Sequence, residues 1–314
     1  MMKVLMLDAG YDLMSDYFRE YRNKVKYCHS ECLYKKTKNR GLFYKLIQFV
    51  GIYLFSPILF LVYGNWKKEI EKYDIFILTS RRSSKYAVQY ISKYCNKKKK
   101  RLIVWYWNVV SGEEMNPEWC RKYNAELWTF DQGDAKKFNM HYNNTYYFSE
   151  LKKDDNYNYS DIFYVGLEKE GRYEILQWLQ KECDRNKLIT DFNVVKNSNY
   201  KGNNKINYIE SMDYFEVLKR ISGTKCILDI NNSNQIGLTL RPLESIFFEK
   251  KLITNNKNIR NFDFYNKNNI FIIGVDKIEK LKYFIELKYN EIDRKIMHKY
   301  TFENWLDRIV SYKK

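Results

Sequence analysis

Short apolar runs alternate with amphipathic stretches along the first half of the chain. The apolar runs cover Lys3–Leu7, Val25–Cys28, Asp74–Thr79, Leu102–Trp107 and Ala125–Phe130. Continuous apolar runs of this length are typical of strands that are buried on both faces of a parallel sheet. The stretches between them, notably Tyr11–Tyr21 and Tyr86–Tyr94, carry apolar residues at helical spacing. We therefore predict an α/β sheet in which parallel strands alternate with helices.

The same pattern begins again after a polar stretch at Lys152–Tyr159. The predicted strands of the second half are Ile162–Val165, Asp191–Val195, Ile206–Ile209, Cys226–Ile230, Leu252–Thr254 and Ile270–Ile273. Helices are predicted at Arg172–Lys181, Tyr214–Ser222 and Ile278–Tyr289. This repetition predicts two domains, residues 1–155 and 156–314, each with its own sheet. We expect the last helix, residues 300–311, to pack back on the first domain.

A glycine turn stands between a predicted buried strand and a predicted helix, at Gly237, Leu238 and Thr239. The first amides of a helix lack partners and the helix dipole favours negative charge, so such a turn can bind an anion. Arg241 opens the helix and Glu244 follows one turn later. We predict that the turn and Arg241 bind a diphosphate and that Glu244 binds the hydroxyls of a ribose. The alternative is an ordinary surface ion pair between Arg241 and Glu244.

Two cations follow another glycine, which ends the first predicted strand of the second half. Gly166 is followed by Lys169 and Arg172. Two cations in this place could offset the charge of an anionic ligand. The alternative is solvated charge at the start of a helix, where cations are slightly unfavourable. No Asp-x-Asp triplet occurs in the chain.

Carboxylates of the first half are candidates for catalysis. Asp131 lies where a predicted strand ends, and Asp8 follows the first predicted strand. The carboxyl ends of parallel strands share one edge of a sheet, where ligands bind. Asp131 and Asp8 are therefore candidate bases, and Gly10 and Asp12 lie on the turn that follows the first strand. Asp134 is predicted to cap the helix that follows.

The composition is that of a folded and basic protein. The chain has 314 residues, 45% of them hydrophobic, and a net charge of +17. This apolar content excludes a disordered chain. Residues 1–101 contain 22 Lys and Arg against 8 Asp and Glu, so most of the net charge belongs to the first domain. Such a surplus indicates an anionic partner, which is nucleic acid, a membrane surface or a phosphorylated acceptor.

An apolar stretch with basic flanks lies in this region. Residues 46–64 are 19 residues without a charge, about the length of a membrane span. A true span would separate two strands of one sheet, Lys3–Leu7 and Asp74–Thr79. We therefore predict an in-plane segment at residues 35–68 that docks on anionic lipid. The alternative is a pair of core helices. Dispersed tyrosines and the lack of a nucleic-acid-binding motif argue against a nucleic-acid partner.

Several motifs together resemble one group of enzymes. They are LWTFDQGDAKKF, SDIFYVG with the following Lys169 and Arg172, GLTLRPLESIFFEKKLITNN, FDFYNKNNIFIIG and WLDRI. They are similar to bacterial GT-B glycosyltransferases of capsular and O-antigen polysaccharide synthesis, over most of residues 100–310. The resemblance implies two Rossmann-like domains that face across a cleft, with the acceptor on the first and a nucleotide-sugar on the second. It also implies that the loop after Gly166 meets the nucleotide, that Lys169 and Arg172 offset the charge of the departing diphosphate, and that Gly10 and Asp12 contact the acceptor. GT-A enzymes commonly hold a metal on the diphosphate with an Asp-x-Asp triplet, so we expect neither a metal nor a cofactor besides the donor substrate.

We therefore expect a metal-independent glycosyltransferase that acts on a nucleoside-diphosphate sugar and a glycan or lipid-linked acceptor. An inverting reaction needs a carboxylate base from the first domain, whereas a retaining reaction does not, and both stay open. Two alternatives remain: a non-catalytic GT-B-like subunit of a polysaccharide assembly complex, and a transferase of a non-sugar group. The first residues lack the pattern of a secretion signal, so we expect a cytoplasmic protein on the inner face of the cell membrane.

Overall fold

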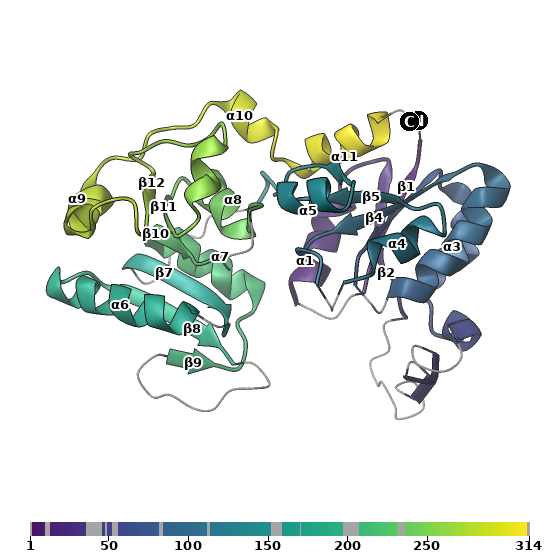
Figure 1. The fold of residues 1–314 in the computed structure, drawn as a ribbon, viewed down its shortest axis with the longest axis horizontal. Helices are drawn as coiled ribbons and strands as arrows, with labels where there is room; N and C mark the ends of the chain where they lie inside the picture. The colour runs from purple at the N-terminus through teal and green to yellow at the C-terminus, as the bar shows by residue number, and fades with distance from the viewer. Residues whose placement is uncertain are drawn as a thin grey trace. The chain divides into compact units, whose positions relative to one another are not determined.

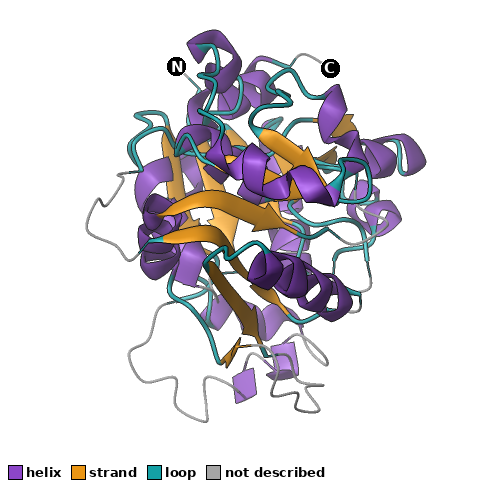
Figure 2. Ribbon diagram, turned by 90° about the vertical axis from the view of Figure 1, so that its left-hand side faces the viewer, coloured by secondary structure: helices purple, strands orange, loops and turns teal. Residues whose placement is uncertain are grey.

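The computed structural model describes residues 2–9, 13–35, 46–47, 49–51, 56–81, 84–111, 114–151, 159–169, 171–196, 207–231 and 236–312. The chain forms two compact units, Met1–Asn144 with Leu306–Lys314 (unit 1) and Thr145–Trp305 (unit 2). Each unit contains a sheet with flanking helices (Figure 1), and the strands are enclosed by helices (Figure 2). The division falls before the predicted boundary at residue 155 and groups the end of the chain with the first half.

Unit 1 is built on a parallel sheet of six strands. In order across the sheet they are β2 (Cys28–Cys32), β1 (Val4–Asp8), β3 (Ile75–Thr79), β4 (Arg101–Tyr106), β5 (Glu126–Thr129) and β6 (His141–Tyr142). The predicted strands that correspond to β1, β3, β4 and β5 are confirmed. The prediction at Val25–Cys28 is wrong, because β2 begins only at Cys28. β2 is an edge strand with alternating burial, so its sequence lacks a continuous apolar run.

The α-helices of unit 1 are α1 (Leu13–Arg22), α3 (Lys85–Lys98), α4 (Pro117–Arg121), α5 (Gln132–Lys137) and the end of α11 (Phe302–Ser311). Three short 3-10 helices precede β3: η1 (Ser56–Leu61), η2 (Asn65–Lys68) and η3 (Ile70–Lys72). α3 buries Ala87, Val88 and Ile91 in a core that it shares with alternate residues of β3 and β4. Within the part of the chain that the structure describes, each helix is too short or too polar to span a bilayer.

The last turns of α11 pack on the sheet of unit 1. Arg101, the first residue of β4, donates from Nη1 to the carbonyl oxygens of Ile309 (3.0 Å) and Val310 (3.2 Å). The same guanidinium pairs with Glu126 on β5, at 2.9 and 2.8 Å. Carbonyl groups at the end of a helix lack partners within the helix, so Arg101 supplies one.

Unit 2 is built on a second parallel sheet of six strands. In order across the sheet they are β12 (Ile270–Ile272), β11 (Lys251–Thr254), β10 (Thr224–Asp229), β7 (Ser160–Leu167), β8 (Thr190–Val195) and β9 (Asn207–Ile209). All six strands predicted for the second half are confirmed. If β7 is numbered as strand 1 of the unit and β12 as strand 6, the order read from β9 is 3-2-1-4-5-6. This is the strand order of Rossmann dinucleotide-binding folds. The order reverses between β7 and β10, which are neighbours although β8 and β9 separate them in the chain.

The α-helices of unit 2 are α6 (Arg172–Arg185), α7 (Tyr214–Gly223), α8 (Leu240–Phe247), α9 (Leu281–Glu286) and α10 (Arg294–His298), with short 3-10 helices η5 (Lys257–Asn261) and η6 (Ile278–Lys280). α6 and α9 share one core with alternate strand residues, whereas α7 and α8 contact β10. The helix predicted over Ile278–Tyr289 is confirmed from Ile278 to Glu286, with η6 as its first turn, but it ends before Leu287 and not at Tyr289.

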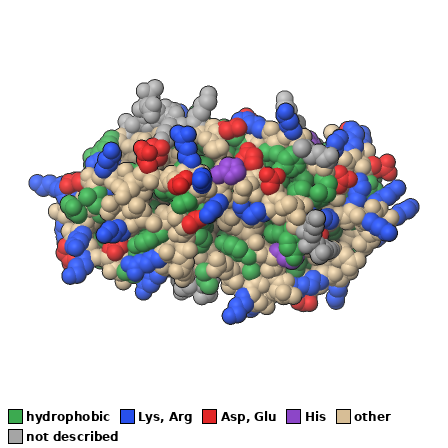
Figure 3. Space-filling view, turned by 90° about the horizontal axis from the view of Figure 1, so that it is seen from above, with side chains coloured by type: hydrophobic (Ala, Val, Ile, Leu, Met, Phe, Trp, Pro, Cys, Tyr) green, Lys and Arg blue, Asp and Glu red, His purple; other side chains and the backbone are tan. Residues whose placement is uncertain are grey.

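The basic surplus is dispersed rather than gathered on the face that Figure 3 shows. Lys and Arg side chains lie there among Asp, Glu and apolar side chains, without forming one continuous stripe. Ion pairs one turn apart on helices, such as Arg121 with Glu118 and Arg185 with Glu182, lie at least partly in solvent. Pairs of this kind contribute little to stability, but they divide a basic surface into smaller areas.

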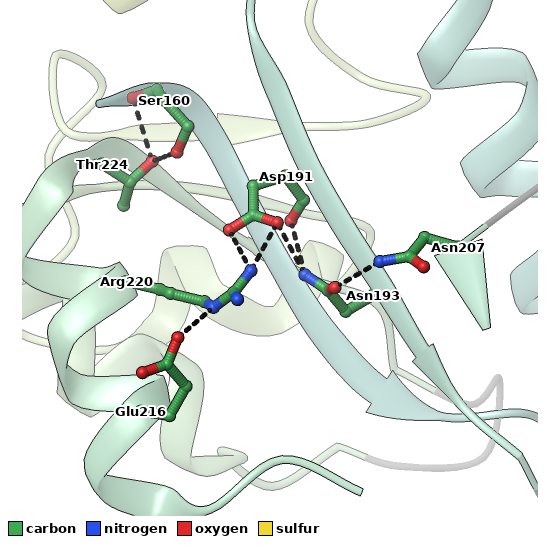
Figure 4. Close-up of polar contacts among 7 residues, drawn as sticks. All are labelled: Ser160, Asp191, Asn193, Asn207, Glu216, Arg220 and Thr224. Atoms are coloured by element: carbon green, nitrogen blue, oxygen red, sulfur yellow. Dashed lines mark hydrogen bonds and ion pairs between the residues drawn. The ribbon is translucent and has the colours of Figure 1, made fainter. Parts of the chain in front are cut away.

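A polar network fixes α7 against β8 and β9 (Figure 4). Arg220 on α7 donates from Nη1 to both carboxylate oxygens of Asp191, each at 2.9 Å, and from Nε to Glu216 at 2.9 Å. Asn193 donates to Asp191 at 2.8 Å and accepts from Asn207 at 2.7 Å. Charge-assisted bonds of this kind depend strongly on geometry, so the network sets the position of α7 along the sheet.

Candidate active site

The carboxyl ends of β7 and β10 bring together several of the residues singled out in the sequence. β7 ends at Leu167 and β10 ends at Asp229. The Nη2 atom of Arg241, on α8, lies 3.5 Å from the carbonyl oxygen of Val165 on β7. Ligands of open parallel sheets bind outside the carboxyl ends of the strands where the strand order reverses. This edge of unit 2 is therefore the candidate site.

The turn before α8 is held from two directions. Thr239 is the N-cap residue, yet its side chain makes no capping bond, and its hydroxyl donates to Asp229 Oδ1 at 2.9 Å. Leu238 is buried beside Gly237, and its carbonyl oxygen accepts from the Thr145 hydroxyl at 2.8 Å. The turn is thus fixed while Thr239 leaves the first N–H groups of the helix uncapped, which is the arrangement that binds anions.

Asp229 connects the turn to the sheet. Its Oδ2 atom accepts from the hydroxyl of Thr254, on β11, at 3.2 Å. Burial raises the pKa of Asp229, while the hydroxyls of Thr239 and Thr254 and the charges of Arg241 and Arg172 lower it. Two arginines therefore act on a single buried carboxylate. Both arginines therefore lie near the carboxyl end of β10.

Glu244 and Arg241 form an ion pair that is only partly open to solvent. The Glu244 side chain is 1% exposed, and its Oε2 atom is bonded to Arg241 Nη1. Its Oε1 atom accepts from the hydroxyl of Tyr214 at 2.9 Å, and that hydroxyl lies 2.8 Å from the hydroxyl of Tyr147. The Arg241 side chain is 20% exposed. Of this pair, Arg241 presents the accessible charge.

A second polar group lies at the end of β7, around Gly166. A Cβ atom at Gly166 would lie 2.5 Å from the Tyr164 hydroxyl oxygen and 3.4 Å from Arg172 Nη1. Tyr164 is 3% exposed, and neither its hydroxyl nor the buried Nε of Arg172 has a hydrogen-bond partner among the described residues. Burial raises the pKa of Tyr164, and the nearby charges of Arg172 and Arg241 lower it. Buried polar groups without partners are rare, and these two donors suit an anionic ligand.

The remaining predicted residue of this loop is Lys169. It follows β7 by two positions and is exposed. The structure therefore brings Gly166, Arg172 and Arg241 together at the end of β7, with Lys169 on the loop between β7 and α6.

The predicted carboxylates of unit 1 are partly occupied by neighbours. Asp8 ends β1, is buried, and is bonded through Oδ1 to Arg19 and through Oδ2 to Arg22, the latter at 3.0 Å. Both of its carboxylate oxygens thus already have a cationic partner. Gly10 and Asp12, the predicted acceptor contacts, lie outside the described residues.

Asp131 lies two residues beyond the end of β5. It is the N-cap of α5, with Oδ1 accepting from the Asp134 N–H at 3.0 Å. The prediction that Asp134 is the N-cap is therefore wrong, because the helix starts earlier, at Gln132. Asp134 lies in the first turn and accepts from the Val110 N–H at 2.7 Å. Asp131 remains a carboxylate at the carboxyl edge of the sheet.

No group of three His, Cys, Asp or Glu side chains that could hold a metal ion occurs among the residues that the structure describes. Sequence reasoning missed four residues of the site: Tyr147, Tyr164, Tyr214 and Asp229. Asp229 and Tyr164 lie in predicted strands, so their place near a carboxyl end was a usable signal. Tyr147 and Tyr214 reach Glu244 only through tertiary packing, and no local pattern marks them.

Comparison with known proteins gives the architecture. No protein-family model matches the sequence, and no curated protein matches it. The solved structure of S. aureus MnaA with UDP aligns with 98% of this chain and 95% of its own, at 13% identity and a TM-score of 0.53. The chain has the GT-B fold.

Two further solved structures, which also align over more than nine tenths of both chains, are named as glycosyltransferases. The apo lipopolysaccharide outer core galactosyltransferase WaaB aligns over 99% of both chains, at 16% identity and a TM-score of 0.49. The glycotransferase of kitacinnamycin aligns over 95% of this chain and 92% of its own, at 8% identity and a TM-score of 0.44. One fold supports many activities, so the activity of this GT-B chain rests on its own site.

Proposed function

We propose that the protein is a metal-independent glycosyltransferase that uses a nucleoside-diphosphate sugar. The observation that supports this most is the pair of buried, unpartnered donors, Tyr164 Oη and Arg172 Nε, beside Gly166. They lie at the point where the strand order of a Rossmann-type sheet reverses. With Arg241 they offer a phosphate group several donors in one place, which is how arginine recognises phosphate. The resemblance to polysaccharide glycosyltransferases makes a glycan or lipid-linked acceptor, in cell-surface polysaccharide synthesis, the expected partner.

In the proposed reaction an acceptor hydroxyl attacks the anomeric carbon, and the bond from that carbon to the diphosphate oxygen breaks. Arg241, Arg172 and Lys169 offset the negative charge that develops on the departing diphosphate, together with the amides after Gly237. The hydroxyl proton passes to a base if the configuration inverts. Asp131 is the better candidate base, because both oxygens of Asp8 are already bonded to arginines.

The first test is a thermal-shift panel of UDP-, GDP-, CMP- and TDP-sugars. We expect stabilisation by one nucleotide class, by about 4 °C when the ligand is present at 100 times its dissociation constant. UDP-sugars are the first choice, because the similar MnaA structure contains UDP. Arg172→Ala should abolish the shift. Arg185→Ala is the matched control, because Arg185 lies at the other end of α6 and is exposed.

Stabilisation by none of these nucleotides would contradict the proposal. Stabilisation by a nucleotide-sugar, with neither transfer of the sugar to a glycan nor its hydrolysis, would favour a non-catalytic GT-B-like subunit. Transfer of a group other than a sugar from a nucleotide-linked donor would favour a transferase of another group. Transfer from the selected donor, measured by product mass, would support the glycosyltransferase.

The proposed membrane contact is the tip of unit 1 around η1. Phe60 is 45% exposed and Leu61 is 57% exposed. Lys35 Nζ donates to the Leu61 carbonyl oxygen at 2.8 Å, and Lys67 Nζ lies 4.0 Å from the centre of the Phe60 ring. Burial lowers the pKa of Lys67, as do the nearby charges of Lys35 and Lys68. Apolar side chains surrounded by lysines suit an anionic lipid surface, with the chain on the cytoplasmic side of the cell membrane.

We expect Lys67→Gln combined with Lys68→Gln to weaken binding to anionic vesicles about 30-fold, since each lysine near the surface contributes about 1 kcal/mol. Flotation with vesicles of phosphatidylglycerol and phosphatidylcholine measures this, and the wild-type binding should fall as salt rises. Phe60→Ser with Leu61→Ser should also weaken it. Tyr283→Ser, an exposed aromatic of unit 2, is the control. Unchanged flotation of the Lys and the Phe60/Leu61 variants would contradict membrane docking.

A further inference from the structure

Glu244 is enclosed by its protein partners. Oε2 is bonded to Arg241 and Oε1 accepts from Tyr214, while 1% of the side chain is exposed. Because the side chain is so little exposed, a ribose hydroxyl could reach this carboxylate only if the groups that enclose it moved. Each bond also satisfies a buried charge, and losing such a bond is unfavourable.

The hydroxyls of Tyr147 and Tyr214 form a chain of hydrogen bonds that leads to Glu244, and each donates toward the carboxylate. Burial, followed by the charges of Glu244 and Tyr147, raises the pKa of Tyr214 well above its usual value, so Tyr214 keeps its proton and donates to Glu244. Its oxygen is then the acceptor for the Tyr147 hydroxyl, 2.8 Å away. The chain therefore runs from Tyr147 to Tyr214, then to Glu244, and ends at the ion pair with Arg241.

Hydrogen bonds hold the backbone at or next to both tyrosines. Tyr147 donates its N–H to the Tyr300 carbonyl oxygen at 2.8 Å and accepts from the Phe302 N–H at 2.9 Å. Tyr214 is the first residue of α7, whose N-cap Asp213 accepts from the Phe215 N–H at 2.8 Å. The network of Figure 4 holds the same helix on β8 and β9. The chain thus links Arg241 to rigid parts of unit 2.

We propose that Tyr214 and Tyr147 are positioning residues that hold Glu244, and through it the Arg241 guanidinium, for a diphosphate. Glu244 then acts on Arg241 and does not touch the ribose. An arginine that is held in place before the ligand arrives loses less freedom on binding, so it binds phosphate more tightly. This inference rests on the proposed nucleotide-dependent function and assigns roles within the same site.

The test compares three probes, UDP, inorganic pyrophosphate and uridine, by calorimetry. Tyr214→Phe removes one hydroxyl, and we expect about tenfold weaker binding of UDP and pyrophosphate with unchanged uridine affinity. Tyr147→Phe should have a smaller effect, about twofold to threefold, because Tyr214 still reaches Glu244. Tyr289→Phe is the matched control: it also removes a buried hydroxyl of unit 2, and that hydroxyl has no hydrogen-bond partner among the described residues.

Glu244→Gln provides a second variant that keeps the shape of the side chain. The positioning role predicts loss of pyrophosphate affinity with unchanged uridine affinity. Weaker uridine binding with unchanged pyrophosphate binding would show that Glu244 touches the ribose and would overturn the inference. UDP and pyrophosphate affinities of Tyr214→Phe equal to those of the wild type would also overturn it. The proposed function would survive that result, provided that the wild type binds UDP and Arg172→Ala does not.

Discussion

Replacing Arg241 by alanine is expected to weaken nucleoside-diphosphate binding about 100-fold and to lower the free energy of unfolding by about 3 kcal/mol. Binding falls because Arg241 presents the accessible charge of the site, beside the Val165 carbonyl. Stability falls because Glu244, which is 1% exposed, keeps a buried charge without its cation. Calorimetric titration with UDP and urea unfolding measure the two effects separately.

The double variant Arg241→Ala with Glu244→Gln separates stability from binding. Removing both charges of a buried pair is far less destabilising than removing one, so part of the lost stability should return. The diphosphate affinity should stay low, because the guanidinium is still missing. Restored binding in the double variant would mean that Arg241→Ala acts only through unfolding, and that the anion site lies elsewhere.

Gly166→Ala is expected to weaken diphosphate binding about tenfold or more and to destabilise the protein by about 1–3 kcal/mol. A Cβ atom there would lie 2.5 Å from the Tyr164 hydroxyl oxygen and 2.9 Å from its Cζ atom, and the ring is buried. Tyr164 must therefore move, and Arg172, whose Nη1 atom would lie 3.4 Å away, must adjust with it. Binding constants for UDP and pyrophosphate and a melting curve measure the result.

Gly274→Ala is the matched control for Gly166→Ala. Gly274 has a φ of 76° and open space around its Cα atom, so alanine there strains the backbone without a steric contact. We expect a similar loss of stability, about 1 kcal/mol, and unchanged UDP affinity. If both glycine variants bind UDP as tightly as the wild type, the polar group around Gly166 does not take part in binding.

Two parallel sheets could be predicted from the sequence because their strands are short apolar runs that need no partner to be recognised. β10 and β11 are examples, since each is buried on both faces and lies between polar segments. β2 was placed too early because an edge strand carries polar residues on one side. The helix predicted to end at Tyr289 was too long, since apolar spacing alone does not reveal where the backbone of Leu287 becomes extended.

For the candidate site, too, some residues could be predicted from the sequence and others could not. Gly166, Arg172 and Arg241 could be named from the sequence, because glycine turns and helix starts after buried strands are local patterns. The residues that surround them in the folded protein could not all be predicted. Tyr164 lies in a predicted strand only two residues before Gly166, whereas the Tyr214 partner of Glu244 comes from α7, 30 residues away in the chain.

The sequence by itself determined the alternation of strands and helices, the two sheets and the loops that carry the cations. These follow from periodicity and from the backbone limits of glycine and of helix ends, which act over a few residues. Only the tertiary structure decided that Glu244 is enclosed by Arg241 and Tyr214, and that Tyr164 and Arg172 keep unpartnered donors. Burial and hydrogen bonding depend on segments far apart in the chain, and no local pattern encodes them.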